Sequence, residues 1–368
     1  MEHSSESTLP RLRTGDLIEI GRQIEPDLTE RKLEYWRNQN LLPAPERSGQ
    51  EGKRPIWTYP DETADQLLTL LRLRKESRDP NILRAALWFE GYPVKMTRVR
   101  NSIGTCLRQL QATFEKELEK RRPQVADEGE ASWLAIEQVA SKLARKRREG
   151  FPRLGRQSQT DRIQAVALML GLLFENPLAM RRLEHDAPSV ERLVGLDQGR
   201  RVRPAGIGPW LDRPPEETLE VFARVGNLSR LTEVIDIASD EELLLARTFC
   251  RNLLDGMTAF SKITDAFVGM DNTSGMAGIE LLQGNPYTAV VILPLFVSIL
   301  RSAALVENLE QVVHSLQTSI IPLEQQAKEL AVLSEDDRSK RLKNLSKLPF
   351  VEQLRIKRLI AKYSETVG

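Results

Sequence analysis

The segment Leu28–Tyr59 joins a short helix, rich in cations and aromatic residues, to a stretch punctuated by proline and glycine. The helix is expected over Glu30–Asn40, because Pro43 prevents its continuation. The run Pro55–Tyr59 is prone to β structure, so a two-stranded hairpin with its loop near Ser48–Gly52 is expected to follow. A helix small enough for the major groove of DNA, followed by a basic ribbon, is the layout of a winged helix-turn-helix.

The rest of the sequence indicates helices separated by proline and glycine breaks, with no alternating run of strand length. The other expected helices are Gly15–Gln23, Asp61–Ser77, one from Pro80 to the stop at Gly91, Met96–Arg122, Ser132–Arg148, Asp161–Glu175, Pro177–Asp186, Glu216–Val225, Ser229–Ile237, Asp240–Phe267, Ile279–Gln283, Pro286–Leu333, Glu335–Leu345 and Pro349–Tyr363. The predicted fold class is mostly α: an N-terminal winged helix-turn-helix with a small β wing, a dimerisation helix and a C-terminal all-α domain.

The breaks divide the chain into five parts. Residues 1–10 are expected to form a disordered tail, 11–93 the winged helix-turn-helix, 94–122 the dimerisation helix, 123–158 a basic helix and linker, and 159–368 the all-α domain. An acidic hinge is expected at Ala126–Ala131, and a linker at Phe151–Ser158. In the dimerisation helix, apolar side chains recur at steps of three and four: Met96, Val99, Ile103, Leu107, Leu110, Phe114 and Leu118. That spacing is close to a heptad seam and predicts that the helix pairs two protomers.

The formal net charge is only +1, so any attraction to phosphate must come from local clusters. Gly91–Thr160 holds fifteen lysines and arginines against eight aspartates and glutamates, whereas Pro10–Pro80 holds thirteen of each sign. The basic tract Lys142–Arg148, with Arg153 and Arg156, admits two interpretations. It is either a solvated helix end, where cations are favourable, or a set of contacts to phosphates or to an acidic partner.

An ordered set of motifs lies in the N-terminal quarter of the chain. Thr29–Leu42 carries the aromatic pair Tyr35-Trp36, Leu41-Leu42-Pro43 forms a turn, and Tyr59-Pro60-Asp61-Glu62 leads from the hairpin into a helix. In this order the segment Arg13–Pro93 resembles the MerR family of bacterial regulators. The resemblance implies a dimeric transcription regulator whose first hairpin arginine, here Arg47, contacts DNA, and whose members distort promoter DNA.

Three positions depart from the pattern of that family. Asn40 replaces the usual turn glycine, which is tolerable because asparagine also adopts left-handed backbone. Trp57 stands in place of the second hairpin arginine, and Lys53 and Arg54, a few residues earlier, can substitute for it. Glu34 replaces an arginine, and its carboxylate would be repulsive beside a phosphate.

Two interpretations of Glu34 are open: it pairs with Arg31 or Arg37, which we favour, or it accepts a hydrogen bond from a cytosine amino group. Arginine and lysine side chains of the helix can donate to base edges or phosphates, Tyr35 can donate to a phosphate, and the hairpin cations can contact the flanking backbone or minor groove. The residues expected to contact DNA are Thr29, Arg31, Lys32, Tyr35, Arg37, Arg47, Lys53, Arg54 and Tyr59.

No catalytic residue, metal site or cofactor is predicted. Gly269–Gly278 lacks the lysine and spacing of a phosphate loop, and no nucleophile or paired-carboxylate signature is present. Cys106 lies on the dimerisation helix, where two copies could meet and serve redox or metal chemistry, but a buried seam residue is the favoured interpretation. Cys250 is expected in the core. The histidines are too scattered for a metal cluster: His3, His185 and His314.

The segment Tyr287–Leu300 is strongly apolar, but it is short for a membrane span and contains Pro294. A buried core helix is expected there, with no membrane association. Two cysteines and no apolar leader fit a reducing cytoplasm.

These features together predict a cytoplasmic, nucleoid-associated homodimer that binds double-stranded DNA and regulates transcription. Two interpretations of the all-α domain are open: its apolar side chains form an ordinary core, or they line a site for a small apolar ligand or a protein partner. One alternative is a structural DNA-associated protein of the partition or excision type. Another is a module whose winged helix binds protein.

Overall fold

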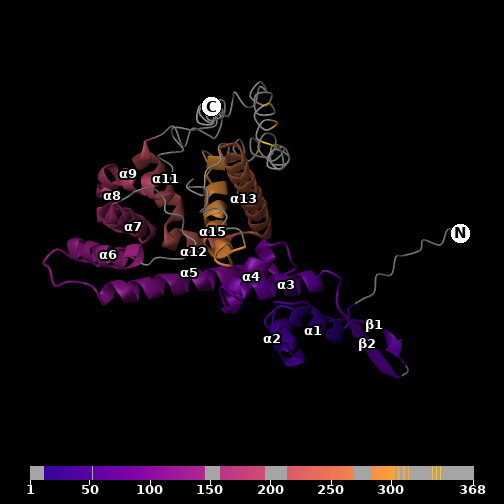
Figure 1. Ribbon diagram of the computed structural model, residues 1–368. Helices are drawn as coiled ribbons and strands as arrows, with labels where there is room; N and C mark the ends of the chain where they lie inside the picture. The colour runs from indigo at the N-terminus through magenta and orange to yellow at the C-terminus, as the bar shows by residue number, and fades with distance from the viewer. Residues whose placement is uncertain are drawn as a thin grey trace. The chain divides into compact units, whose positions relative to one another are not determined.

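The computed structural model describes residues 12–51, 53–145, 158–194, 214–268 and 284–302, with single residues at 305, 306, 310, 314, 334, 337 and 340. It is mostly helical, with a two-stranded antiparallel sheet (Figure 1). The chain divides into two compact units. The first comprises Met1–Cys106 and Gly284–Val291, and the second Leu107–Gln283 and Ile292–Gly368. The expected helices Ile279–Gln283 and Pro349–Tyr363, and most of the linker Phe151–Ser158, lie outside the described residues.

The first unit follows the predicted order of elements. These are α1 (Thr14–Arg22), α2 (Glu30–Asn38), β1 (Glu46–Glu51), β2 (Arg54–Thr58), α3 (Thr63–Leu73), α4 (Pro80–Phe89) and the first part of α5 (Met96–Glu119). Side chains fix two of the helix starts: the Thr29 hydroxyl accepts from the Lys32 amide, and the Asp79 carboxylate from the Asn81 amide. α3 ends four residues before Ser77, contrary to prediction, and the Ser77 hydroxyl accepts a hydrogen bond from the Asp79 amide in the following turn.

Close packing of α1 against the start of α2 depends on one small residue. A Cβ added at Gly21 would lie 2.3 Å from the Cδ2 atom of Leu28, which is fully buried. After α2 the chain turns at Asn40, whose φ of 54° lies in the left-handed region. The expectation that asparagine takes the place of a turn glycine is therefore confirmed. The core of this unit consists mainly of leucines and aromatic residues, including Leu17, Leu28, Leu33, Trp36, Tyr59, Leu67, Leu70 and Leu87.

The hairpin has a defined register. Arg47 pairs with Trp57 and Glu51 with Arg54, and the register shifts between Arg47 and Gly49. The strands extend further than predicted, because the expected loop at Ser48–Gly52 is largely part of β1. The Ser48 hydroxyl donates to the Ile56 carbonyl, which ties the irregular part of β1 to β2.

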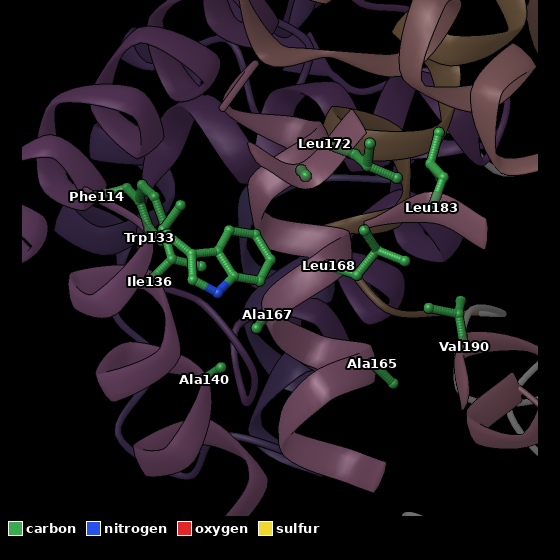
Figure 2. Close-up of a cluster of buried hydrophobic side chains, with 11 residues drawn as sticks. Phe114, Trp133, Ile136, Ala140, Ala165, Ala167, Leu168, Leu172, Leu183 and Val190 are labelled. Atoms are coloured by element: carbon green, nitrogen blue, oxygen red, sulfur yellow. The ribbon is translucent and has the colours of Figure 1, made fainter. Parts of the chain in front are cut away.

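All the regular secondary structure among the described residues of the second unit is helical. Its elements are the rest of α5, α6 (Glu128–Arg145), α7 (Gln159–Leu173), α8 (Pro177–Arg181), α9 (Leu183–Val194), α11 (Pro215–Gly226), α12 (Leu228–Ile237), α13 (Asp240–Val268) and the larger part of α15 (Thr288–Leu300). Figure 2 shows how side chains of several helices meet around Trp133. Gly171 permits this approach, because a Cβ there would lie 2.7 Å from that of Ala179 and 2.9 Å from the Trp133 ring.

Several predicted boundaries in this unit are wrong. The acidic hinge expected at Ala126–Ala131 is largely helical instead, because α6 begins at Glu128 and the Asp127 carboxylate just before it accepts from the Glu130 amide. The single helix expected at Pro177–Asp186 is two helices, and α9 continues through Pro188 because its buried face packs against α7. The helix expected over Pro286–Leu333 breaks after Leu300.

The apolar helix α15 keeps Pro294 in its interior, and most of its side chains are buried. In the part of the chain that the structure describes, no helix is both long and apolar enough to cross a membrane.

The apolar stripe of α5 does not face outward. Val99 and Ile103 are fully buried and Leu107 is 1% exposed, whereas Leu110 is 43% exposed. Phe114 stacks on Phe174, with ring centroids 3.6 Å apart, and belongs to the buried cluster of Figure 2. The side chains expected to meet a second protomer are thus largely buried within one chain, so pairing through this stripe is not supported. A heptad-like pattern indicates that one face of a helix is buried, but the surface that covers this face can belong to the same chain.

Candidate functional site

The exposed face of α2 is the first part of the candidate site. Leu33 and Trp36 point into the core, at 0% and 2% exposed. An α-helix advances about 100° per residue, so residues 31, 34, 35 and 38 share one side of α2, opposite Leu33 and Trp36. These exposed side chains are Arg31, Glu34, Tyr35 and Asn38. The helix therefore presents a cation, a carboxylate, a phenol and an amide on one face.

Lys32 lies on the flank of α2 and is held by two carboxylates. Its ammonium group is 2.7 Å from Glu25 and 2.7 Å from Asp27. The hydrogen bonds that Lys32 donates to Asp27, and next to Glu25, raise its pKa above the ordinary value. The predicted role of Lys32 as a donor to DNA competes with this intramolecular pairing.

Glu25 also holds the end of α3. Its second oxygen is 2.6 Å from Arg74, whose guanidinium lies 4.7 Å from the centre of the Trp36 ring. A cation over an aromatic face is attracted by the ring quadrupole. Glu25 thus links α2 to the end of α3, because it binds Lys32 on the flank of α2 and Arg74, whose guanidinium lies over the buried Trp36.

Arg37 lies on the other flank of α2 and reaches the base of the hairpin. It donates to the Tyr59 hydroxyl at 2.9 Å, and Tyr59 is only 1% exposed. The Tyr59 amide in turn donates to the Leu12 carbonyl. Tyr59, which is among the residues predicted to contact DNA, is therefore buried between α2 and the hairpin and holds the two together. Thr29, also among the residues predicted to contact DNA, caps the start of α2, where its hydroxyl accepts from the Lys32 amide.

The hairpin carries the second part of the candidate site. Arg47 and Lys53 are exposed, and the structure gives neither an ion pair nor a hydrogen bond within the described ranges. Trp57 is 51% exposed. Arg54 begins β2 opposite Glu51. Two hairpin cations are thus available to an external partner, whereas two of the three α2 cations are engaged within the unit.

The ion pair of Glu34 with Arg31 or Arg37, which the sequence favoured, does not form. It is exposed, and the described residues offer it no ion-pair partner, neither Arg31 nor Arg37. Its carboxylate stands free on the outward face of α2, one turn from Arg31.

Arg84, which the sequence did not mark as part of the site, fixes the end of α2. Arg84, on α4, donates to the Gln39 carbonyl at 2.7 Å and to Asn81 at 2.8 Å. It also donates to the Ser102 hydroxyl of α5 at 2.7 Å. Burial lowers the pKa of the Arg84 guanidinium below its ordinary value, because burial disfavours the charged form. The available signal was a cation inside the apolar run Pro80–Phe89, where an interior arginine needs polar partners.

The thiols and the basic tract do not extend this site. Cys106 and Cys250 are free and buried, and burial raises the pKa of each thiol to about 12. Across the described ranges, no group of three or more histidine, cysteine, aspartate or glutamate side chains could hold a metal ion. Lys142 is exposed near the end of α6, and residues 146–156 lie outside the described part of the chain.

Comparisons with protein-family models, with curated proteins and with solved structures returned no match.

Proposed function

We propose that this protein is a homodimeric, sequence-specific DNA-binding transcription regulator, whose first unit forms a winged helix-turn-helix. The proposal rests on one observation: a short helix, anchored by Leu33 and Trp36, turns its opposite face outward beside a hairpin with two available cations. A helix of this size fits the major groove, and an adjacent basic ribbon fits the flanking backbone.

The proposal assigns the DNA contacts to the exposed cations that have no partner within the described residues. Arg31 is the α2 cation on the outward face, so it is assigned to a base edge or a phosphate, and Tyr35 to a phosphate. Arg47 and Lys53 are assigned to the backbone beside the major-groove site. The contacts of Lys32 with Glu25 and of Arg37 with Tyr59 would instead hold α2 in its orientation.

Dimer formation and the second unit complete the proposal. Two copies would place two α2 helices on a near-palindromic site. Since most of the α5 stripe is buried, the proposal places the second copy on the exposed face of that helix, which includes Leu110. The second unit would bind a small apolar ligand or a protein partner, and the assembly would act in the cytoplasm on the nucleoid.

A second candidate follows from the free carboxylate of Glu34. Near phosphates it would be repulsive, and the unit as a whole has little excess of positive charge. A surface of mixed charge fits a protein partner, so the alternative is a module in which α2 and the hairpin bind protein. Binding to duplex DNA decides between the two.

The test selects duplexes from a randomised library with the full-length protein and then measures binding by fluorescence anisotropy. The double variant Arg31→Ala, Arg47→Ala should lose at least tenfold in affinity, while Arg181→Ala, an exposed arginine on α8 of the second unit, should bind as the wild type does. No enrichment of any duplex, or equal binding by all three proteins, would refute the proposal.

A further inference from the structure

Trp57 is the exposed tryptophan of the first unit. Its side chain is 51% exposed, whereas Trp36 and Trp88 are 2% and 3% exposed. No hydrogen-bond partner for its indole N–H lies among the described residues. An exposed indole on a two-stranded hairpin gains little from the fold of its own chain.

The register places Trp57 beside a cation. Directly opposed residues of an antiparallel pair point to the same face of the ribbon, and Trp57 is opposite Arg47. The neighbours of Trp57 along β2 are more covered, since Thr58 is buried and Ile56 is partly buried. One face of the hairpin therefore combines a large aromatic ring with an available guanidinium.

This combination fits the minor groove of duplex DNA. Its walls are deoxyribose rings lined by phosphates, so a guanidinium can pair with phosphate while an apolar side chain packs against sugars or a partly unstacked base step. A tryptophan also keeps an indole N–H to donate to an acceptor in the groove. A second cation at this position would instead add only an electrostatic contact, which salt weakens.

Resting on the proposed function, we propose that Trp57 is a minor-groove contact whose indole is covered by DNA beside the major-groove site of α2. Arg47 supplies the neighbouring phosphate contact. The indole thus contributes a part of the affinity that does not depend on salt. This part favours base steps that unstack easily at the edge of the site.

Two readouts test the inference with the full-length protein and a duplex selected as above. In the first, acrylamide quenching of tryptophan emission is compared between wild type and Trp57→Phe, and the difference isolates Trp57. DNA should protect this emission. In the second, Trp57→Ala should weaken binding by about 5- to 150-fold, the range for loss of an aromatic–base contact, without changing the salt dependence.

Matched variants separate the outcomes. Trp57→Phe should keep most of the affinity, and Trp57→Arg should steepen the salt dependence by about 0.9 in log–log slope per protomer. If the wild type binds DNA but Trp57 stays accessible to acrylamide and Trp57→Ala binds normally, the inference is overturned and the proposed function stands. If Trp57 is protected without DNA as protein concentration rises, a second copy covers it and the inference is also overturned. If no duplex binds, the proposed function itself fails.

Discussion

The structure separates two cations that look equivalent in sequence, and their salt dependence should differ. Arg47 is exposed and free of partners within the described part of the hairpin, whereas Lys32 is held at 2.7 Å by each of two carboxylates. Replacing Arg47 with alanine should remove one phosphate contact. Replacing Lys32 should remove none and should instead lower the midpoint of chemical denaturation slightly, because partly exposed ion pairs contribute little to stability.

The size of the effect follows from the count of available cations. Arg31, Arg47 and Lys53 would neutralise three phosphates per protomer. For the dimer, with six such contacts, this gives a log–log salt slope of about −5.4, or a loss of about 1,800-fold in affinity between about 50 and about 200 mM salt. Without Arg47 in either protomer the slope becomes about −3.6, and the same change in salt costs only about 150-fold.

Fluorescence anisotropy of a labelled duplex across a salt series measures both slopes. Chemical denaturation of the two variants supplies the stability control, because Lys32→Ala should shift the midpoint and Arg47→Ala should not. If Lys32→Ala flattens the salt slope as much as Arg47→Ala does, Lys32 leaves its carboxylates for DNA, and the assignment of Lys32 to an intramolecular pair is refuted.

Further predictions concern the fold of the first unit and the thiols. Arg37→Met should destabilise the protein by about 1–3 kcal/mol, because it leaves the buried Tyr59 hydroxyl without its donor, and the loss should shrink in a Tyr59→Phe background. Asn40→Gly should change stability by less than about 0.5 kcal/mol while Asn40→Val should cost about 1–2 kcal/mol, as measured by urea denaturation, because the φ of 54° disfavours a branched side chain. Iodoacetamide at about pH 8 should modify Cys106 and Cys250 only after denaturation, because burial keeps both as neutral thiols; rapid labelling of the native protein, seen by mass spectrometry, would contradict this.

The elements of the first unit were predictable because their signals are local. The threonine before α2, the proline after it and the asparagine at residue 40 set the boundaries from within a few positions. The start of α4 at Pro80 and of α5 at Met96 follow in the same way.

The roles of the α2 cations were not predictable, because their partners are chosen by the fold. Arg37 donates to Tyr59, which is 22 residues away. Glu25, the partner of Lys32, also binds Arg74 across 49 residues. Composition shows that cations are present, but only the packing of α1, α3 and the hairpin decides which remain available. The stripe of α5 failed for the same reason, since Phe114 finds its partner at Phe174 within the same chain.

The central claim is that the outward face of α2 lies against duplex DNA. Replacing Tyr35, which is 52% exposed on that face, with the photo-crosslinker p-benzoylphenylalanine tests it directly. The same crosslinker at Met169, 44% exposed in the second unit, is the control. After irradiation with a selected duplex, position 35 should crosslink to DNA and position 169 should not. Absence of a DNA crosslink at position 35, or equal crosslinking at both positions, would contradict the account.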